Sequence, residues 1–168
     1  QGSLVYGKTS DHLLGLTAVL ANGEQVETQP VSIEDAKLKA KGDSQESEIY
    51  RQVLETCVGH REAILKKFPR LNRFLTGYDL EHAYDDDQID VGRLIAGSEG
   101  SLAFITEAKL SLDVIASHKA LVNITYRSFD DALRHAPQLV KANATSVETI
   151  DSNVLNFAKT DIVWHDIQ

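Results

Sequence analysis

The chain has 168 residues, with 25 acidic and 17 basic side chains and a formal net charge of −8. This balance leaves no basic stripe that could neutralise phosphates, so we expect no nucleic-acid partner. The single cysteine, Cys57, excludes an internal disulfide or a CxxC metal knuckle and agrees with a cytoplasmic protein. No apolar run is long enough for a membrane span. The sequence opens on Gln1 and contains no methionine, and we interpret it as a segment of a longer protein.

The first 43 residues predict a β-hairpin between two less regular segments. A short strand is expected over residues 4–6. Strands over 16–20 and 24–28 flank Asn22-Gly23, two residues that tolerate the positive φ of a two-residue hairpin turn. Residues 32–43 are polar and rich in lysine, and we expect mainly a loop there.

A long helix is predicted from Asp43 to the residue before Pro69. Glu46 follows Asp43 at the spacing of a capping box, and proline disfavours a helical residue before it. Gly59 is expected to weaken the middle of this helix. The apolar positions recur at helical spacing and predict one buried face: Tyr50, Val53, Leu54, Cys57, Val58, Ile64, Leu65 and Phe68. Because Cys57 lies on that face, a buried thiol is favoured over a nucleophile.

Residues 70–113 predict a short helix and a long strand after an irregular stretch. A turn is expected at 76–79. The acidic run at 85–87 lacks the ligand spacing of an EF-hand, so a solvated loop is favoured over a calcium site. Asp90 is expected to cap a helix over 91–95. Residues 102–112 alternate between polar and apolar positions, which predicts a strand with one apolar face.

The remaining residues predict alternating strands and helices. A strand over 120–126 precedes a helix from Ser128 to Ala142, which Pro137 should kink. A strand over 145–150 and a helix over 151–159 would follow. This β-α-β-α order is typical of the first half of a ferredoxin-like unit, so the fold class is α+β.

The segment Gly97-Ser-Glu-Gly100 is the sharpest candidate for a binding site. Two glycines let the backbone turn tightly and approach a ligand closely. A plain helix-to-strand turn explains the same residues, and on these four alone it is the better interpretation. The spacing matches neither the dinucleotide-binding GxGxxG motif nor a Walker A loop. The six histidines show no metal-ligand spacing, and no Ser-His-Asp set can be argued.

Three stretches, in the same order, resemble the FAD-linked oxidase family, the vanillyl-alcohol oxidase type of flavoprotein. They are residues 7–23, the Thr-Gly-Tyr-Asp-Leu run of 76–80, and residues 94–110, which include Gly-Ser-Glu-Gly-Ser-Leu-Ala-Phe-Ile-Thr-Glu-Ala. Within that family the sequence is most similar to the D-2-hydroxy-acid dehydrogenase branch, in particular to large bacterial proteins that fuse this module to an iron–sulfur domain. A chance match by an unrelated α+β interaction domain is the weakest alternative.

The resemblance implies an FAD-binding domain made of two α+β subdomains that clasp the cofactor. Residues 1–113 would form its C-terminal part, the second subdomain. Residues 114–168 would be the truncated beginning of a ferredoxin-like cap domain on the substrate side. The missing N- and C-terminal parts of the same chain would hold the pyrophosphate loop, the catalytic histidines, the metal ligands and any iron–sulfur cluster. We therefore predict no catalytic and no metal-binding residue in this segment.

The resemblance also implies which residues bind FAD, mostly through the backbone. They are Gln1, Gly2, Gly97, Glu99, Gly100, Ser101, Leu102, Ala103, Phe104 and Ile105. Ala103 stands where many relatives have glycine, which narrows the room for the cofactor.

The implied reaction oxidises a D-2-hydroxy acid, of the D-2-hydroxyglutarate or D-lactate type, by hydride transfer to flavin. The alternative is a non-catalytic flavin-binding or assembly module. The segment alone is expected to be inactive and to bind FAD weakly or not at all.

Overall fold

The computed structural model describes residues 3–69, 71, 77–85 and 87–166. Two of the predicted FAD-binding residues, Gln1 and Gly2, lie outside this part, as do Thr76 and Asp86. The chain divides into two compact units. One is Gly7–Asp113, and the other contains the chain from Val114 onwards together with α1 (Ser3–Tyr6). Helices and small antiparallel sheets make this an α+β fold, as expected.

The predicted hairpin is confirmed, with a different turn. Strands β1 (Leu13–Val19) and β2 (Gln25–Thr28) pair antiparallel. The Gly23 N–H donates to the Leu20 carbonyl at 2.9 Å, and of the two predicted turn residues only Gly23 has a positive φ, of 87°. The predicted two-residue turn is therefore wrong. A four-residue turn closed on a left-handed glycine connects twisted strands without a positive φ at Asn22.

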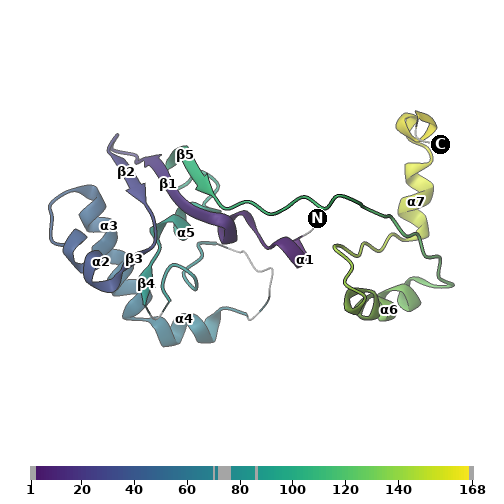
Figure 1. The fold of residues 1–168 in the computed structure, drawn as a ribbon, viewed down its shortest axis with the longest axis horizontal. Coiled ribbons are helices and arrows are strands. Elements are labelled where there is room, and N and C mark those ends of the chain that lie inside the picture. Colours follow the sequence, from purple (N-terminus) through teal and green to yellow (C-terminus); the bar gives the residue numbers. More distant parts are fainter. Residues whose placement is uncertain (1–2, 70, 72–76, 86, 167–168) are drawn as a thin grey trace. The chain divides into compact units, whose positions relative to one another are not determined.

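Strand β5 (Phe104–Leu110) pairs with the other edge of β1, which gives the strand order β2-β1-β5 (Figure 1). The predicted strand over 102–112 is confirmed with shorter bounds. Its apolar face is not buried, because every residue of β5 is exposed. The sheet residues that enter the core belong instead to β1 and β2, which face the helices.

A helix, α2 (Ile33–Lys39), replaces the loop predicted over 32–43. It follows β3 (Val31–Ser32), which pairs with β4 (Gln88–Ile89). The Ser32 hydroxyl caps the helix by accepting the Asp35 N–H at 3.1 Å. Acidic side chains in the first turn and lysines in the last turn suit the helix dipole, so the polar composition favours a helix here.

The predicted long helix is present in three pieces: α3 (Gln45–Val53), a π-helical turn over Leu54–Val58, and α4 (Arg61–Lys67). Its cap is Ser44, one residue after the predicted Asp43, and it ends before Pro69 as expected. Gly59 lies at the break. Of the predicted buried face, Tyr50, Val53, Cys57 and Ile64 are buried, whereas Val58 and Leu65 are exposed. The wider π turn changes the helical phase, which explains the difference.

The short helix α5 (Val91–Ile95) has Asp90 at its N-cap position, as predicted, but the Asp90 side chain accepts no capping hydrogen bond. Its apolar side chains join those of the sheet and of α3 in one core. The buried members of this core are Leu13, Leu16, Ala18, Val26, Ala36, Tyr50, Val53, Cys57, Ala83, Ile89, Val91, Ile95 and Ala103. The chain leaves this core at Ala103 to form the exposed strand β5.

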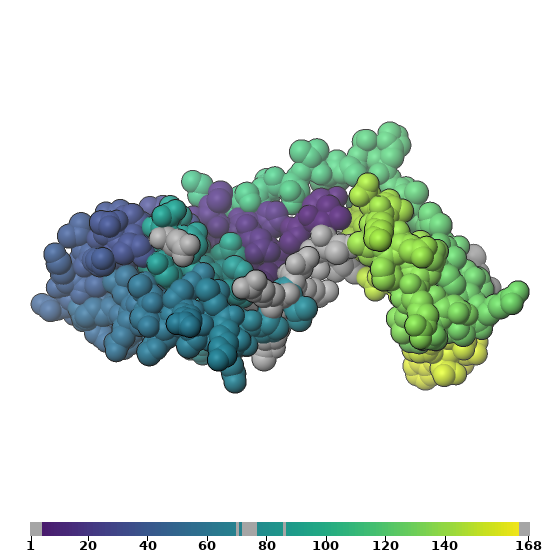
Figure 2. Space-filling view, turned by 90° about the horizontal axis from the view of Figure 1, so that it is seen from below, coloured from purple at the N-terminus to yellow at the C-terminus, as the bar shows by residue number. Residues whose placement is uncertain are grey.

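The second unit contains α6 (Phe129–Lys141) and α7 (Ser152–Ala158), capped by Ser128 and Asp151, and both predicted helices are confirmed. A 3-10 helix over Ile162–Asp166 follows. Neither α6 nor α7 has a buried residue, and both lie on the surface of this unit, green to yellow in Figure 2.

Three predicted strands are wrong. Residues 120–126 and 145–150 have no regular structure, and residues 4–6 lie in α1. A strand needs a hydrogen-bonded neighbour, and the described residues of this unit offer none. None of the described helices has the length and apolar character that a membrane crossing requires.

Candidate functional site

The loop between α5 and β5 carries most of the predicted FAD-binding residues. Its centre is a four-residue turn, closed by the Ser101 N–H, which donates to the Ser98 carbonyl at 3.0 Å. The two central residues, Glu99 and Gly100, have φ values of 53° and 78°. Positive φ at both central positions defines a type I′ turn. Gly97, just before it, also has a positive φ, of 100°.

Glu99 occupies the left-handed region without being a glycine. In the described part of the chain, Asn143 is the other non-glycine residue with a positive φ. This conformation costs about 1 kcal/mol for a residue with a Cβ atom. A type I′ turn requires a positive φ at this position, so the strain arises because a glutamate stands where glycine, asparagine or aspartate is usual.

Side-chain hydrogen bonds hold the turn in place. The Ser101 hydroxyl donates to the Ser98 carbonyl at 2.6 Å, and the Tyr78 hydroxyl lies 3.1 Å from Ser101 Oγ. Ser98 and Ala103 are buried at the two ends of the loop, whereas Glu99, Gly100 and Ser101 are exposed. The turn thus projects from the core between two buried residues.

The backbone of this projection is free to contact a ligand. Among the described residues, the N–H groups of Glu99 and Gly100 have no protein acceptor. A Cβ atom added to Gly100 would meet no atom within 4 Å, so the space beside the turn is open. Phe104 and Ile105, the last two predicted residues, continue the exposed surface onto β5, with Phe104 74% exposed.

A mainly apolar cavity of about 470 Å³ lies behind the loop, on the core side. Leu102 and Ala103 of the loop form part of its wall; Ala103 is buried, whereas Leu102 is also exposed at the surface. Further apolar walls come from α3, the π-helical turn, α5, the Tyr78 turn and the hairpin, and they include Leu20, Ala21, Ile49, Val53, Cys57, Leu80, Leu94 and Ile95. Burial raises the pKa of the Cys57 thiol, which keeps that wall uncharged.

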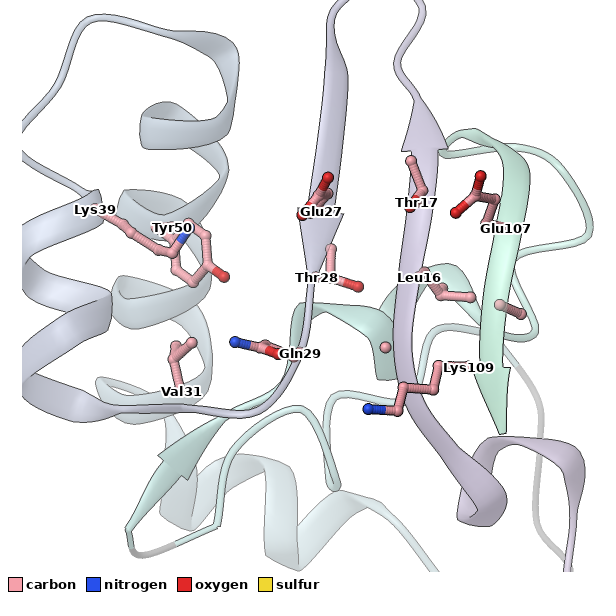
Figure 3. Close-up of a pocket in the computed structure, with 12 residues that line it drawn as sticks. Leu16, Thr17, Glu27, Thr28, Gln29, Val31, Lys39, Tyr50, Glu107 and Lys109 are labelled. Carbon is pink, nitrogen blue, oxygen red and sulfur yellow. The ribbon is translucent and has the colours of Figure 1, made fainter. Parts of the chain in front are cut away.

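A second cavity, of about 360 Å³, opens where β2 leaves β1 (Figure 3). Its lining is more polar, with Lys39 on one side and Lys109 on the other. The Lys39 ammonium is paired with Glu46 at 2.6 Å and lies 5.2 Å from the centre of the Tyr50 ring. Glu27 and Glu107 balance the lysines, so the lining has no net charge.

Tyr50 and Thr28 line both cavities. Their side-chain hydroxyls are buried without a hydrogen-bond partner, and the residues are 1% and 6% exposed. Burial raises the pKa of Tyr50 to about 12, with a further contribution from the negative charges of Glu46 and Asp90. Tyr50 therefore remains a hydrogen-bond donor across the physiological range.

The sequence placed Tyr50 only as a core residue and gave no indication of Thr28. The apolar helical spacing around Tyr50 predicts burial but says nothing of its hydroxyl. Thr28 faces the core because it stands opposite Leu16 in the hairpin register. Within the described residues, no three His, Cys, Asp or Glu side chains gather as metal ligands would.

Comparison with known proteins shows what this segment is similar to. A D-2-hydroxyglutarate dehydrogenase of Pantoea ananatis is 55% identical over 170 residues that cover 100% of this chain. Proteins of the same name from Escherichia coli and Pseudomonas putida are 52% and 44% identical, each over 99% of the chain. This chain is a homologue of one segment of these dehydrogenases. The resemblance to the D-2-hydroxy-acid dehydrogenase branch is thereby confirmed.

The chain spans 17% of the length of these relatives. No family model matches it, and no solved structure does either. The alignments with these longer relatives extend over 99–100% of the chain. They therefore include the residues of the glycine loop, of both cavities and of the helices of the second unit.

Proposed function

We propose that this chain is one segment of an FAD-dependent D-2-hydroxyglutarate dehydrogenase and forms one wall of its flavin site. The observation that carries the proposal is the alignment of 99–100% of the chain with dehydrogenases of that name at 44–55% identity. A resemblance spread over the whole segment favours a shared role over a chance match of short motifs.

The glycine loop fits a cofactor that is held through the backbone. Free N–H groups at Glu99 and Gly100 could donate to carbonyl or phosphate oxygens, and the open space at Gly100 leaves room for close approach. The exposed ring of Phe104 offers apolar surface beside them. These features support the loop as the FAD-binding stretch. Ala103, whose methyl group faces inwards to the core cavity, does not narrow that outer surface.

Bound FAD would supply the hydride acceptor for oxidation of the substrate's hydroxyl-bearing carbon. The residues of this chain would orient the cofactor and exclude water from one side of it. Tyr78 and Ser101 would keep the turn rigid, so that its N–H groups stay aimed outwards without reorganisation.

In this proposal residues 1–113 form the C-terminal part of the FAD-binding domain, its second subdomain, and residues 114–168 begin the substrate-side cap. Proton transfer, metal binding and recognition of the substrate's carboxylates would belong to other parts of the longer polypeptide, as would an iron–sulfur cluster. The many exposed apolar side chains of α6 and α7, such as Phe157 at 79%, agree with a unit that other parts of the polypeptide cover. We place the whole protein in the cytoplasm.

The test is the visible spectrum of the longer polypeptide, recorded with and without D-2-hydroxyglutarate, and with D-lactate as the competing substrate. A flavin band that D-2-hydroxyglutarate bleaches is the expected result. A stable flavin band with neither substrate acting would favour a non-catalytic flavin-binding module, and the absence of flavin would contradict the proposal.

A matched pair of variants tests the role of the loop. Gly100→Val forces a β-branched residue to a φ of 78°, and Gly23→Val does the same at 87° in the hairpin tip; both sites are open within 4 Å. The backbone penalty is therefore similar. We expect Gly100→Val to lose bound FAD and Gly23→Val to retain it. Equal retention by both variants would remove the loop from the cofactor site.

A further inference from the structure

Strand β5 has a hydrogen-bonded neighbour on one side only. In the strand order β2-β1-β5 it pairs with β1, and the described part of the chain places no strand along its other edge (Figure 1). This open strand has seven residues and no proline, whereas β2, at the opposite edge of the sheet, has four residues. A long open edge presents a row of backbone N–H and C=O groups that can pair with another strand.

The face of β5 that continues the core of the sheet is also uncovered. Residues directly opposite each other in an antiparallel pair lie on the same face. The register pairs buried residues of β1 with exposed residues of β5: Leu13 with Leu110, Leu16 with Ala108, and Ala18 with Ile105. We call these three β5 residues the apolar strip. Ile105 is 43% and Leu110 41% exposed, so the core that covers β1 stops short of β5.

The opposite face of β5 has a different character. Glu107 and Lys109 lie on it (Figure 3). Phe104 joins them, because a bulge shifts the register between Ile105 and Glu107. The ring that the proposed function assigns to the flavin side is therefore not part of the apolar strip. The strip itself carries no charge that would oppose an apolar neighbour.

We propose that a strand from another part of the longer polypeptide pairs with the open edge of β5 over residues 106–110 and sets apolar side chains beside the apolar strip. A helix could cover the strip, but it would leave the backbone groups of the edge unpaired, so a strand fits both features. The pairing lies beyond Ile105, the last residue assigned to the cofactor.

This inference rests on the proposed function in one respect, because it requires the longer polypeptide of which the chain is a segment. The chain spans 17% of the length of its relatives, so most of such a polypeptide lies outside it. A strand tethered in the same molecule has a higher effective concentration at the edge than a strand of a second molecule. The occupant is therefore another segment of the same polypeptide.

Photo-cross-linking in the longer polypeptide identifies the neighbour of β5. Replacement of the exposed Lys109 by p-benzoylphenylalanine places a photoreactive side chain within reach of an adjacent strand. We expect irradiation to join this position to one peptide outside residues 1–168 of the same molecule. Glu34 on the surface of α2 is the control position and should not yield that peptide. A mixture of isotope-labelled and unlabelled protein separates cross-links within one molecule from those between two.

Residue-resolved amide hydrogen exchange shows whether that neighbour is a strand. In an antiparallel strand with one neighbour, alternate residues turn their N–H groups away from it, so fast and slow exchange should alternate along an open edge. The internal reference is β1, which has a hydrogen-bonded neighbour on both sides. We expect residues 106–110 of the longer polypeptide to lack the fast-exchanging set and to exchange as slowly as β1.

Three results would each overturn the inference: a cross-link to β5 of a second copy, the absence of one preferred peptide, and alternating fast and slow amides over residues 106–110. Neither measurement uses flavin or substrate. A polypeptide whose flavin band bleaches normally while its β5 edge stays open refutes this inference and leaves the proposed function intact. A paired edge in a polypeptide without flavin does the reverse.

Discussion

The Tyr78 hydroxyl lies 3.1 Å from Ser101 Oγ and ties the glycine loop to a turn that stands 23 residues earlier in the chain. Ser101 Oγ also donates to the Ser98 carbonyl at 2.6 Å. One exposed serine thus links two of the three stretches by which the sequence resembles flavoproteins. In this chain, therefore, one of these stretches holds the other in shape.

Ser101→Ala should loosen the glycine loop by removing both of these hydrogen bonds. Because Ser101 is exposed, water replaces part of the loss, and we expect a decrease of about 1 kcal/mol in the free energy of unfolding. Tyr78→Phe removes only one of the bonds and should cost less. Urea unfolding of both single variants and the double variant gives their coupling energy. Purely additive effects would show that the 3.1 Å contact contributes nothing.

Glu99→Gly should stabilise the loop, because glycine occupies a φ of 53° without strain. The gain from relieving the left-handed conformation is partly offset by the entropy that glycine adds to the unfolded chain, and we expect a net increase of up to about 0.5 kcal/mol. Glu99→Ala keeps the strain and is the matched comparison. Thermal unfolding of the two variants tests this prediction, which fails if Glu99→Ala is the more stable of the pair.

The sequence was a good guide wherever local chemistry decides the structure. The caps at Ser128 and Asp151 mark real helices, because a side-chain oxygen accepts an N–H within three residues. The hairpin was also predictable, although Asn22 was assigned a positive φ that it does not adopt. Caps and hairpin turns are decided by residues a few positions apart in the chain, so they can be predicted from the sequence.

Features that depend on contacts between distant residues could not be predicted from the sequence. The strands expected over 120–126 and 145–150 lack partners in the described chain, and β5 remains exposed because its apolar face has nothing to pack against. Tyr50 and Thr28, which stand far apart in the sequence, line one cavity only because α3 packs on the hairpin. The glycine turn was found from the sequence, but its cavity was not.

Cys57 should react very slowly with an aromatic disulfide reagent in the folded chain. The residue is fully buried, and burial raises the pKa of its thiol, so the reactive thiolate is scarce. Because Cys57 is the chain's only cysteine, the absorbance change reports this thiol alone. We expect urea concentrations that unfold the chain to accelerate the reaction by orders of magnitude. Rapid labelling without urea would contradict the burial.

Substitution of Cys57 separates packing from polarity. Cys57→Ala leaves a small cavity and should cost about 1 kcal/mol of unfolding free energy. Cys57→Ser keeps the volume and places a hydroxyl against the apolar wall formed by Val53 and Ile95, where it should cost about 1–3 kcal/mol. Urea unfolding compares the two variants. A serine variant as stable as wild type would mean that water reaches this wall.

Asp90→Asn should reduce the loss of folding stability that occurs when the pH rises from acidic to neutral. Burial raises the pKa of Asp90, and Arg93, whose Nε lies 3.7 Å from it, only partly opposes this. The folded state therefore holds the proton more tightly than the unfolded state. The resulting stability is present below the ordinary carboxyl pKa and is lost as the pH rises through the raised value.

Asparagine removes this loss and still suits an N-cap. Arg93 keeps its 2.9 Å ion pair with Asp11 in the variant. Unfolding free energies at about pH 4 and about pH 7 should show the variant gaining on wild type at the higher pH, and a gain at the lower pH alone would reverse the sign of the argument.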